Sequence, residues 1–233
     1  MNDVVLVDVR AEGNAYVADF ATNLADLLRG RVRVLGADVA DRRSFERILA
    51  AVEEPEAAVL VVGCSDRVAS LAWSLAQQCD KPVVLVPETE AEPAREVMTV
   101  LVPLDGTSEA ANALIATMRL FNGAAVEIVV LHVFDKKTAP RFWDQGPHAE
   151  SAWEEEFRTR FCDDFDARVI LRSGRADESV LEAAAEVRAG LVVLGWAQTR
   201  RYGHARTLQR VVATSTVPLM LVPIGRGGQD LRT

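Results

Sequence analysis

The sequence predicts an α/β protein made of two doubly wound, open parallel-sheet domains, of which the first is abbreviated. The first observation is an internal repeat, since three strand-like segments recur in the same order, and this indicates a duplicated unit. The matched segments are Val4–Val9 with Val100–Asp105, Leu60–Gly63 with Val192–Gly195, and Pro82–Pro87 with Pro218–Pro223. The second observation is that short β-branched runs alternate with helical patterns, which is typical of parallel strands joined by crossover helices.

The spacing of the repeats is the third observation and shows where the two units differ. The first strands lie 96 residues apart (Val4 to Val100), the glycines 132 (Gly63 to Gly195) and the closing strands 136 (Pro82 to Pro218), so the second unit holds 36 extra residues before its glycine strand and 4 after it. We expect two separate, stacked sheets divided near residues 88–97, the second with one more strand. Such insertions are where function is expected.

In the first unit, residues 1–88, we expect strands near 4–9, 31–36, 58–63 and 82–87. Between them, apolar residues recur at the i, i+3, i+4, i+7 spacing of a helix that covers a sheet. The three sets are Val17, Phe20, Ala21 and Leu24; Phe45, Ile48, Leu49 and Val52; and Val68, Leu71, Ala72 and Leu75. Gly30 is expected to close the first helix.

Residues 89–97 are expected to be the linker, 98–224 the second unit and 225–233 a frayed tail. The second unit is expected to contain strands near 98–104, 125–133, 167–172, 191–195 and 217–222, and helices after Thr107, around Val180 and near 206–215. The insertion at 135–166 carries an amphipathic helix with Trp153, Phe157 and Phe161 on one face. It serves either as a cover for the added strand or as an aromatic lid or interface.

Composition excludes several classes of protein. The net charge of −8 argues against nucleic-acid and membrane partners. Neither a signal-peptide pattern nor an apolar run long enough to span a membrane is present, and the three cysteines have no metal spacing. We therefore expect a cytoplasmic protein. The three histidines, His132, His148 and His204, have neither catalytic nor metal-binding spacing, and His132 is expected to be a strand-end residue bonded locally.

Two segments of the second unit are candidates for a binding site, because ligands of such sheets lie beyond the carboxyl ends of the strands. Asp105-Gly106-Thr107 follows the first strand, either as a ligand contact or as an ordinary helix cap. The loop from Gly195 to Thr207 follows the fourth strand and, together with Arg210, contains four arginines and no acidic residue. Either these arginines attract an anion, or they are solvated or paired with surface carboxylates.

Four strand endings together resemble the universal stress protein family. They are Val-Pro-Leu-Asp-Gly-Thr107, Val-Leu-His-Val133, Val-Val-Leu-Gly195 and Val-Pro-Leu-Met-Leu-Val-Pro223. The resemblance covers most of 98–224 and, more faintly, 3–88, which is the pattern of a tandem, two-domain member. It implies the strand order 3-2-1-4-5 and pairing of the two domains within the chain as in the family's dimers. A further homodimer, formed through the aromatic residues of the insertion, is the other option.

The resemblance also implies an ATP-binding loop of pattern G-x2-G-x9-G-[S/T], but the chain departs from it. Gly195 fits the first position, and Gln198 stands where the second glycine is expected. Counting back from Pro218, the final pair of the pattern falls on Ala205-Arg206. Each replaced glycine adds a Cβ where backbone would approach phosphate. Candidate ligand-binding residues are Asp105, Gly106, Thr107, Val133, Gly195, Gly203, His204, Ala205, Arg206 and Thr207. In the first unit Gly63 leads directly into Cys64-Ser65-Asp66, which leaves no room for such a loop.

These observations favour a stress-response protein that acts by binding, without catalytic residues or a metal. Its ligand is expected to be ATP, AMP or another phosphate-bearing compound, if it has one. Because the loop lacks the glycines at 198 and 205 and has Arg206 where a hydroxyl residue is expected, a compact mono- or diphosphate fits better than ATP. The alternative is a nucleotide-dependent enzyme with weak ATPase or phosphoryl-transfer activity in the second unit.

Overall fold

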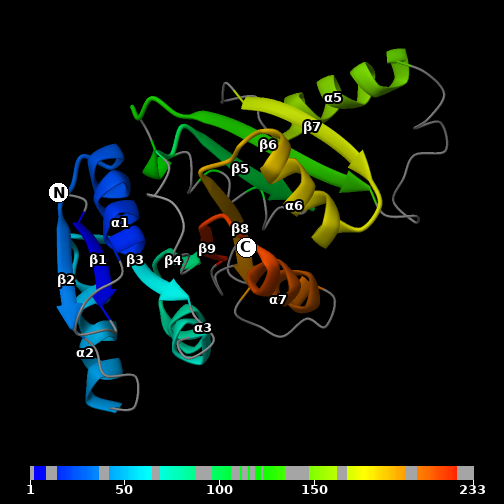
Figure 1. Ribbon diagram of the computed structural model, residues 1–233. Coiled ribbons are helices and arrows are strands. Elements are labelled where there is room, and N and C mark those ends of the chain that lie inside the picture. Colours follow the sequence, from blue (N-terminus) through cyan, green and yellow to red (C-terminus); the bar gives the residue numbers. More distant parts are fainter. Residues whose placement is uncertain are drawn as a thin grey trace, which may run out of the picture.

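A computed structural model of the protein contains one nine-stranded sheet with helices on both faces (Figure 1). The structure describes residues 3–8, 15–36, 42–64, 69–87, 96–105, 111, 115, 119–121, 123–134, 147–161, 167–197 and 204–224. The strands are β1 (Asp3–Asp8), β2 (Val32–Gly36), β3 (Ala57–Cys64), β4 (Val83–Pro87), β5 (Thr99–Leu104), β6 (Glu127–Phe134), β7 (Ala167–Ser173), β8 (Leu191–Ala197) and β9 (Leu219–Ile224). The helices are α1 (Ala15–Leu27), α2 (Arg42–Glu53), α3 (Ala69–Gln78), α5 (Pro147–Phe161), α6 (Ala176–Glu186) and α7 (His204–Thr214). Residues 111, 115, 119 and 120 are also helical.

The strand order confirms the predicted fold class. Across the sheet it reads β2-β1-β3-β4-β9-β8-β5-β6-β7. Numbered within the second unit, the run β7-β6-β5-β8-β9 is the order 3-2-1-4-5. The first unit, β2-β1-β3-β4, has the same order without its third strand. All pairs within each unit are parallel.

The expectation of two separate, stacked sheets is wrong. The edge strand of the first unit, β4, pairs antiparallel with the edge strand of the second, β9, so that Val84 lies opposite Met220. Both strands are apolar and buried. Separate sheets would leave their backbone N–H and C=O groups uncovered, and edge-to-edge pairing satisfies them. The predicted domain boundaries stay predictions, since residues 88–95 lie outside the described part of the chain.

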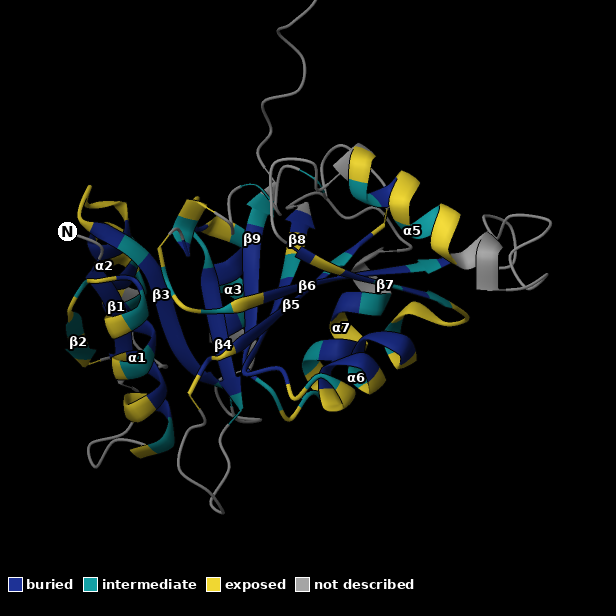
Figure 2. Ribbon diagram, turned by 90° about the horizontal axis from the view of Figure 1, so that it is seen from above, coloured by how far each residue is buried: buried dark blue, intermediate teal, exposed yellow. Residues whose placement is uncertain are grey.

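The hydrophobic core is continuous across the join on both faces of the sheet. Phe20 and Leu24 of α1 belong to the same buried cluster as Val100, Val193 and Met220 of the second unit. The opposite face has two clusters, one under α6 and one under α2 and α3, and the latter also contains Trp196, Leu208 and Leu221 of the second unit. In Figure 2 the strands are largely dark blue, whereas the outer faces of the helices are yellow. The two units therefore share buried clusters on both faces of the sheet, the larger one on the α1 face.

The end of α1 differs in detail from the prediction. The Gly30 N–H donates to the Ala25 carbonyl at 2.8 Å, as expected of a closing residue. The left-handed position, however, is taken by Arg29, with φ of 54°. The Arg29 guanidinium donates to the Gly123 carbonyl at 3.0 Å. This end of α1 is thus bonded to the second unit.

The described part of the insertion forms a cover over the sheet, which is one of the two predicted roles. Phe157 of α5 is buried in the cluster that α1 also lines, and Trp153 packs against it partly buried. Arg158 pairs with Glu154 at 3.1 Å, as the i, i+4 spacing predicts. The strand that this helix covers, β7, pairs with β6 over seven residues. Residues 135–146 and the side chain of Phe161 lie outside the described part.

Candidate functional site

The candidate site lies at the carboxyl ends of β5 and β8, the two strands between which the chain order of the second unit reverses. In parallel sheets such a switch point is where ligands bind. β5 is the central strand of this unit, with β6 on one side and β8 on the other. Its two neighbours are held very differently.

The backbone hydrogen bonds fix which residues of β5 face which neighbour. The Glu127 N–H donates to the Met98 carbonyl at 2.8 Å, and the Gly190 N–H donates to the Thr99 carbonyl at 2.9 Å. Because the hydrogen-bonding direction alternates along a strand, even-numbered residues of β5 face β6 and odd-numbered ones face β8. Pro103 therefore stands where a donor toward β8 is needed, and proline has no N–H.

The pairing between β5 and β8 ends as this geometry requires. Only Val100 with Leu191 and Leu101 with Val192 are paired, although both strands continue toward their carboxyl ends. In contrast, β5 and β6 remain paired through Leu104. Missing ladder bonds leave the carboxyl ends of β5 and β8 free to separate, and Gly195 on β8 is solvent-exposed. The hydrogen-bonded ladder therefore ends early at the switch point of the second unit.

Several predicted site residues lie at or near the ends of strands and helices of the second unit. Asp105 follows β5 and is exposed, and Val133, near the end of β6, is half-buried. Thr207 lies half-buried in α7. Gly106, Thr107 and Gly203 lie outside the described residues, as do the side chains of His204, Ala205 and Arg206. Their contribution therefore stays a prediction.

Helix α7 begins at His204, two residues before the predicted start. Its first turn consequently contains Ala205 and Arg206. Free N–H groups and the helix dipole make the first turn favourable for an anion. Acidic residues are absent from it. We therefore expect an arginine in this turn to add positive potential near the switch point, and this expectation stays a prediction because the side chain of Arg206 lies outside the described part.

Arg210, which the sequence groups with the loop arginines, does not belong to the site. Its Nε donates to the Asp177 carboxylate of α6 at 3.3 Å, and Arg175 donates to the same oxygen at 2.8 Å. The hydrogen bond from Arg175, together with the positive charges of Arg175 and Arg210, lowers the pKa of Asp177 below its ordinary value. For this arginine the prediction of a surface ion pair is the correct one, and its role is to join α6 to α7.

His132 is bonded locally, as predicted. Its Nδ1 lies 2.8 Å from the Leu104 carbonyl, which is consistent with a donated ring N–H. The ring is buried and lies 4.5 Å from Phe134 and 4.9 Å from Phe157, measured between ring centroids. Through these contacts the insertion helix α5 supports the end of β5, directly before Asp105.

Trp196 is a residue near the site that the sequence did not single out. It follows the exposed Gly195, points to the opposite face of the sheet and is buried. Its ring lies 5.0 Å from that of Trp73 on α3, so the two units meet again here. Its indole Nε1 has no hydrogen-bond partner in the structure. Its position directly after the glycine strand was the available signal.

The equivalent place in the first unit is closed. There β1 and β3 stay paired as far as Val7 with Val62, and Gly63 is buried. Among the described residues, no group of three or more His, Cys, Asp or Glu side chains is arranged to hold a metal ion. The described helices include none that is long and apolar enough to cross a membrane.

Comparison with known proteins is consistent with this architecture. The sequence model of the universal stress protein family matches residues 96–223. No curated protein sequence matches the chain. A universal stress protein from Archaeoglobus fulgidus DSM 4304 superimposes with a TM-score of 0.68 at 14% identity, covering 96% of this chain and 99% of that one. A protein of unknown function from Pseudomonas aeruginosa PAO1 superimposes with a TM-score of 0.62 at 16% identity, covering 96% and 93%. Both similarities extend over the two units.

Proposed function

Since the chain belongs to the universal stress protein family, we propose that it acts by binding a small phosphate-bearing anion in its second unit, without catalysis of its own. The observation that carries the proposal is the open switch point. Pro103 ends the pairing of β5 with β8, and Asp105 and Gly195 are exposed near the carboxyl ends of these two strands. In this fold, that position is where a nucleotide can lie across the strand ends.

The charge around the opening supports an anionic ligand. The first turn of α7 adds Arg206 to the N-terminal end of a helix in a chain of net charge −8. A forked guanidinium binds phosphate through two parallel hydrogen bonds. Asp105, on the other side, is an acceptor suited to a sugar hydroxyl or a base. AMP combines both recognition elements.

The size of the ligand follows from the loop sequence. With Gln198 and Ala205 in place of glycine, the backbone cannot approach a triphosphate closely along the whole loop. Binding through an arginine side chain suits one or two phosphates at the helix end. We therefore propose the affinity order AMP above ATP.

Calorimetric titration with AMP, ATP and inorganic phosphate tests this function. Arg206→Ala is expected to weaken AMP binding roughly tenfold or more, since a charge-assisted bond contributes about 1.5–3 kcal/mol. Arg210→Ala is the matched control, because that guanidinium is bound to Asp177, and it should leave the affinity unchanged. Tight ATP binding that Arg206→Ala does not alter would contradict the proposal. ATP turnover with magnesium well above that of Arg206→Ala would instead favour the enzyme alternative.

A further inference from the structure

The outermost strand of the first unit, β2, lies at the end of the sheet, and no described strand pairs with its outer edge (Figure 1). The Val4 N–H donates to the Arg31 carbonyl at 2.9 Å, so odd-numbered residues of β2 face β1. By alternation, the N–H and C=O groups of Val32, Val34 and Gly36 point outward. Such a row of unpaired groups is a template for another strand.

The internal repeat shows what this edge lacks. Val34 pairs with Leu6 of β1, and Val130 of β6 pairs with Val102, the repeat equivalent of Leu6. Val34 and Val130 therefore occupy equivalent positions. Val130 has β7 beside it and α5 over its face of the sheet, and its side chain is 0% exposed, whereas Val34 is 58% exposed. At this position β2 therefore carries an apolar residue, as an interior strand does, but no described strand lies beside it, and Figure 2 colours β2 intermediate to exposed.

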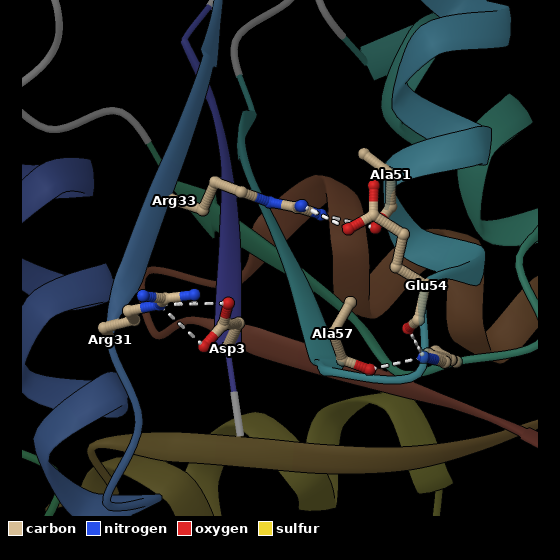
Figure 3. A network of polar contacts seen from close by, with 7 residues as sticks. Asp3, Arg31, Arg33, Ala51, Glu54 and Ala57 are labelled. Carbon is tan, nitrogen blue, oxygen red and sulfur yellow. Dashed lines mark hydrogen bonds and ion pairs between the residues drawn. The ribbon is translucent and has the colours of Figure 1, made fainter. Parts of the chain in front are cut away.

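The charged side chains of β2 do not block the edge. Arg33 pairs with Glu54 and donates to the Ala51 carbonyl at the end of α2, and Arg31 pairs with Asp3 at 3.2 Å (Figure 3). Both guanidinium groups are thus bound to acceptors of their own chain. Charged residues on edge strands normally prevent association, but here that protection is weakened.

The sequence of β2 is complementary to itself. An antiparallel pair of β2 strands centred on Val34 places Val34 opposite its own copy, Val32 opposite Gly36 and Arg33 opposite Leu35. No two like charges then lie directly opposite, and the exposed valine gains an apolar neighbour. The join inside the chain has the same form, since β4 and β9 pair antiparallel with the repeat equivalents Val84 and Met220 opposite each other.

We propose that two copies of this chain associate through their β2 strands, antiparallel and about a two-fold axis at Val34. The occupant of the bare edge is a second copy because the register is symmetric and avoids like charges. A two-fold axis also gives a closed dimer, in which neither β2 edge remains free. This surface lies at the far end of the first unit and does not depend on the proposed ligand site.

Sedimentation velocity on the full chain over a range of concentrations tests the proposal. The wild type should show a monomer–dimer equilibrium. Val34→Lys should raise the dissociation constant roughly tenfold or more, because two lysines would then meet at the axis. Met98→Lys is the matched control, since Met98 is also 58% exposed but lies away from β2, and it should leave the equilibrium unchanged. A wild type that is monomeric at every concentration, or a dimer that Val34→Lys does not weaken, would overturn the proposal.

A cysteine variant tests the register while changing the fold little. In a background with Cys64 and Cys162 replaced by serine, Val34→Cys should form a disulfide-linked dimer under mild oxidation, because opposite residues approach closely enough to be bridged. Gly36→Cys in the same background should not link to itself, since residue 36 lies opposite residue 32. Equal cross-linking of the two variants would overturn the register, and cross-linking of neither would overturn the β2 pairing.

Discussion

The two units bring equivalent strands together at their switch points, but only the first unit keeps them paired toward their ends. In the first, β1 and β3 pair as far as Val7 with Val62, whereas in the second the pairing stops at Leu101 with Val192. Val7 and Pro103 are repeat equivalents, and both face the neighbouring strand. The two units therefore differ by one N–H donor, which Val7 has and Pro103 lacks, and this donor determines how far the central strand stays paired.

Expressing the second unit without the first should have the largest effect on folding. We expect residues 98–233 expressed alone to lose their compact fold, because β9 would lose β4 and the shared cluster would lose Phe20 and Leu24 of α1. Gel filtration and far-ultraviolet circular dichroism against the full chain provide the measurement. A stable monomer with the spectrum expected of an intact half would show that the second unit folds independently.

Removing the N–H donor of Val7 in the first unit should have the next largest effect on stability. The Asp3 N–H donates to the Glu56 carbonyl, so by alternation the Val7 N–H faces β3. Val7→Pro should lower the free energy of unfolding by roughly 2–4 kcal/mol, through a lost ladder bond and an unsatisfied buried carbonyl. Urea denaturation measures it, with Val7→Ala as the control for the lost side chain. Equal effects of the two substitutions would mean that the N–H of Val7 is not needed.

The start of β8 offers a second difference between the units. A Cβ on Gly190 would lie 2.9 Å from the Val97 Cα and 3.0 Å from the Glu96 carbonyl oxygen, whereas the repeat equivalent in the first unit is Ala58. Gly190→Ala should cost about 1–3 kcal/mol, because backbone must move. Gly36→Ala, with no atom within 4 Å of its added Cβ, is the control for urea denaturation. Similar midpoints for both would contradict the close approach.

Supplying the missing N–H donor at position 103 in the second unit should have a smaller effect on stability, and one of opposite sign. Pro103→Val supplies the missing N–H toward β8 and should raise stability by about 0.5–1.5 kcal/mol if the ladder extends. Hydrogen exchange should then show greater protection near Val193. The same variant should weaken AMP binding, because the opening narrows. Unchanged exchange at β8 would mean that another feature keeps the strands apart.

The smallest effect concerns acid stability at the α6–α7 contact. The lowered pKa of Asp177 means that its contribution is present above the unfolded value of about 3.9 and is lost as pH falls through the folded value. Asp177→Asn should therefore flatten the stability profile below about pH 4 and leave AMP binding unchanged. A change in AMP affinity would place Asp177 and Arg210 in the site after all.

Local patterns were sufficient to predict the elements of both units. All nine strands lie where β-branched runs predict them, and the predicted face of α1 is buried at Val17, Phe20, Ala21 and Leu24. These features depend on residues close in sequence, whose periodicity directly reflects burial. The internal repeat also identified the extra strand, β7, before the structure placed it.

Features that depend on distant residues could not be predicted in the same way. The pairing of β4 with β9 requires knowing which edges meet, and apolar edges alone do not specify a partner. Arg210 is adjacent to the loop in sequence, yet its carboxylate partner Asp177 lies on another helix. Pro103 was visible as part of a strand ending, but its effect depends on the direction of its absent N–H, which only the register fixes.

The shared core also bears on how the duplicated copies diverged. A redundant copy is usually free to decay, but Phe20 and Leu24 of the first copy lie in the cluster that buries Val100 and Met220 of the second. A substitution that changes only the switch point of the first copy leaves this cluster intact, whereas one that unfolds the first copy also exposes the core of the second. The packing of the second copy therefore explains why the strands and α1 of the first copy are retained although the two switch points differ.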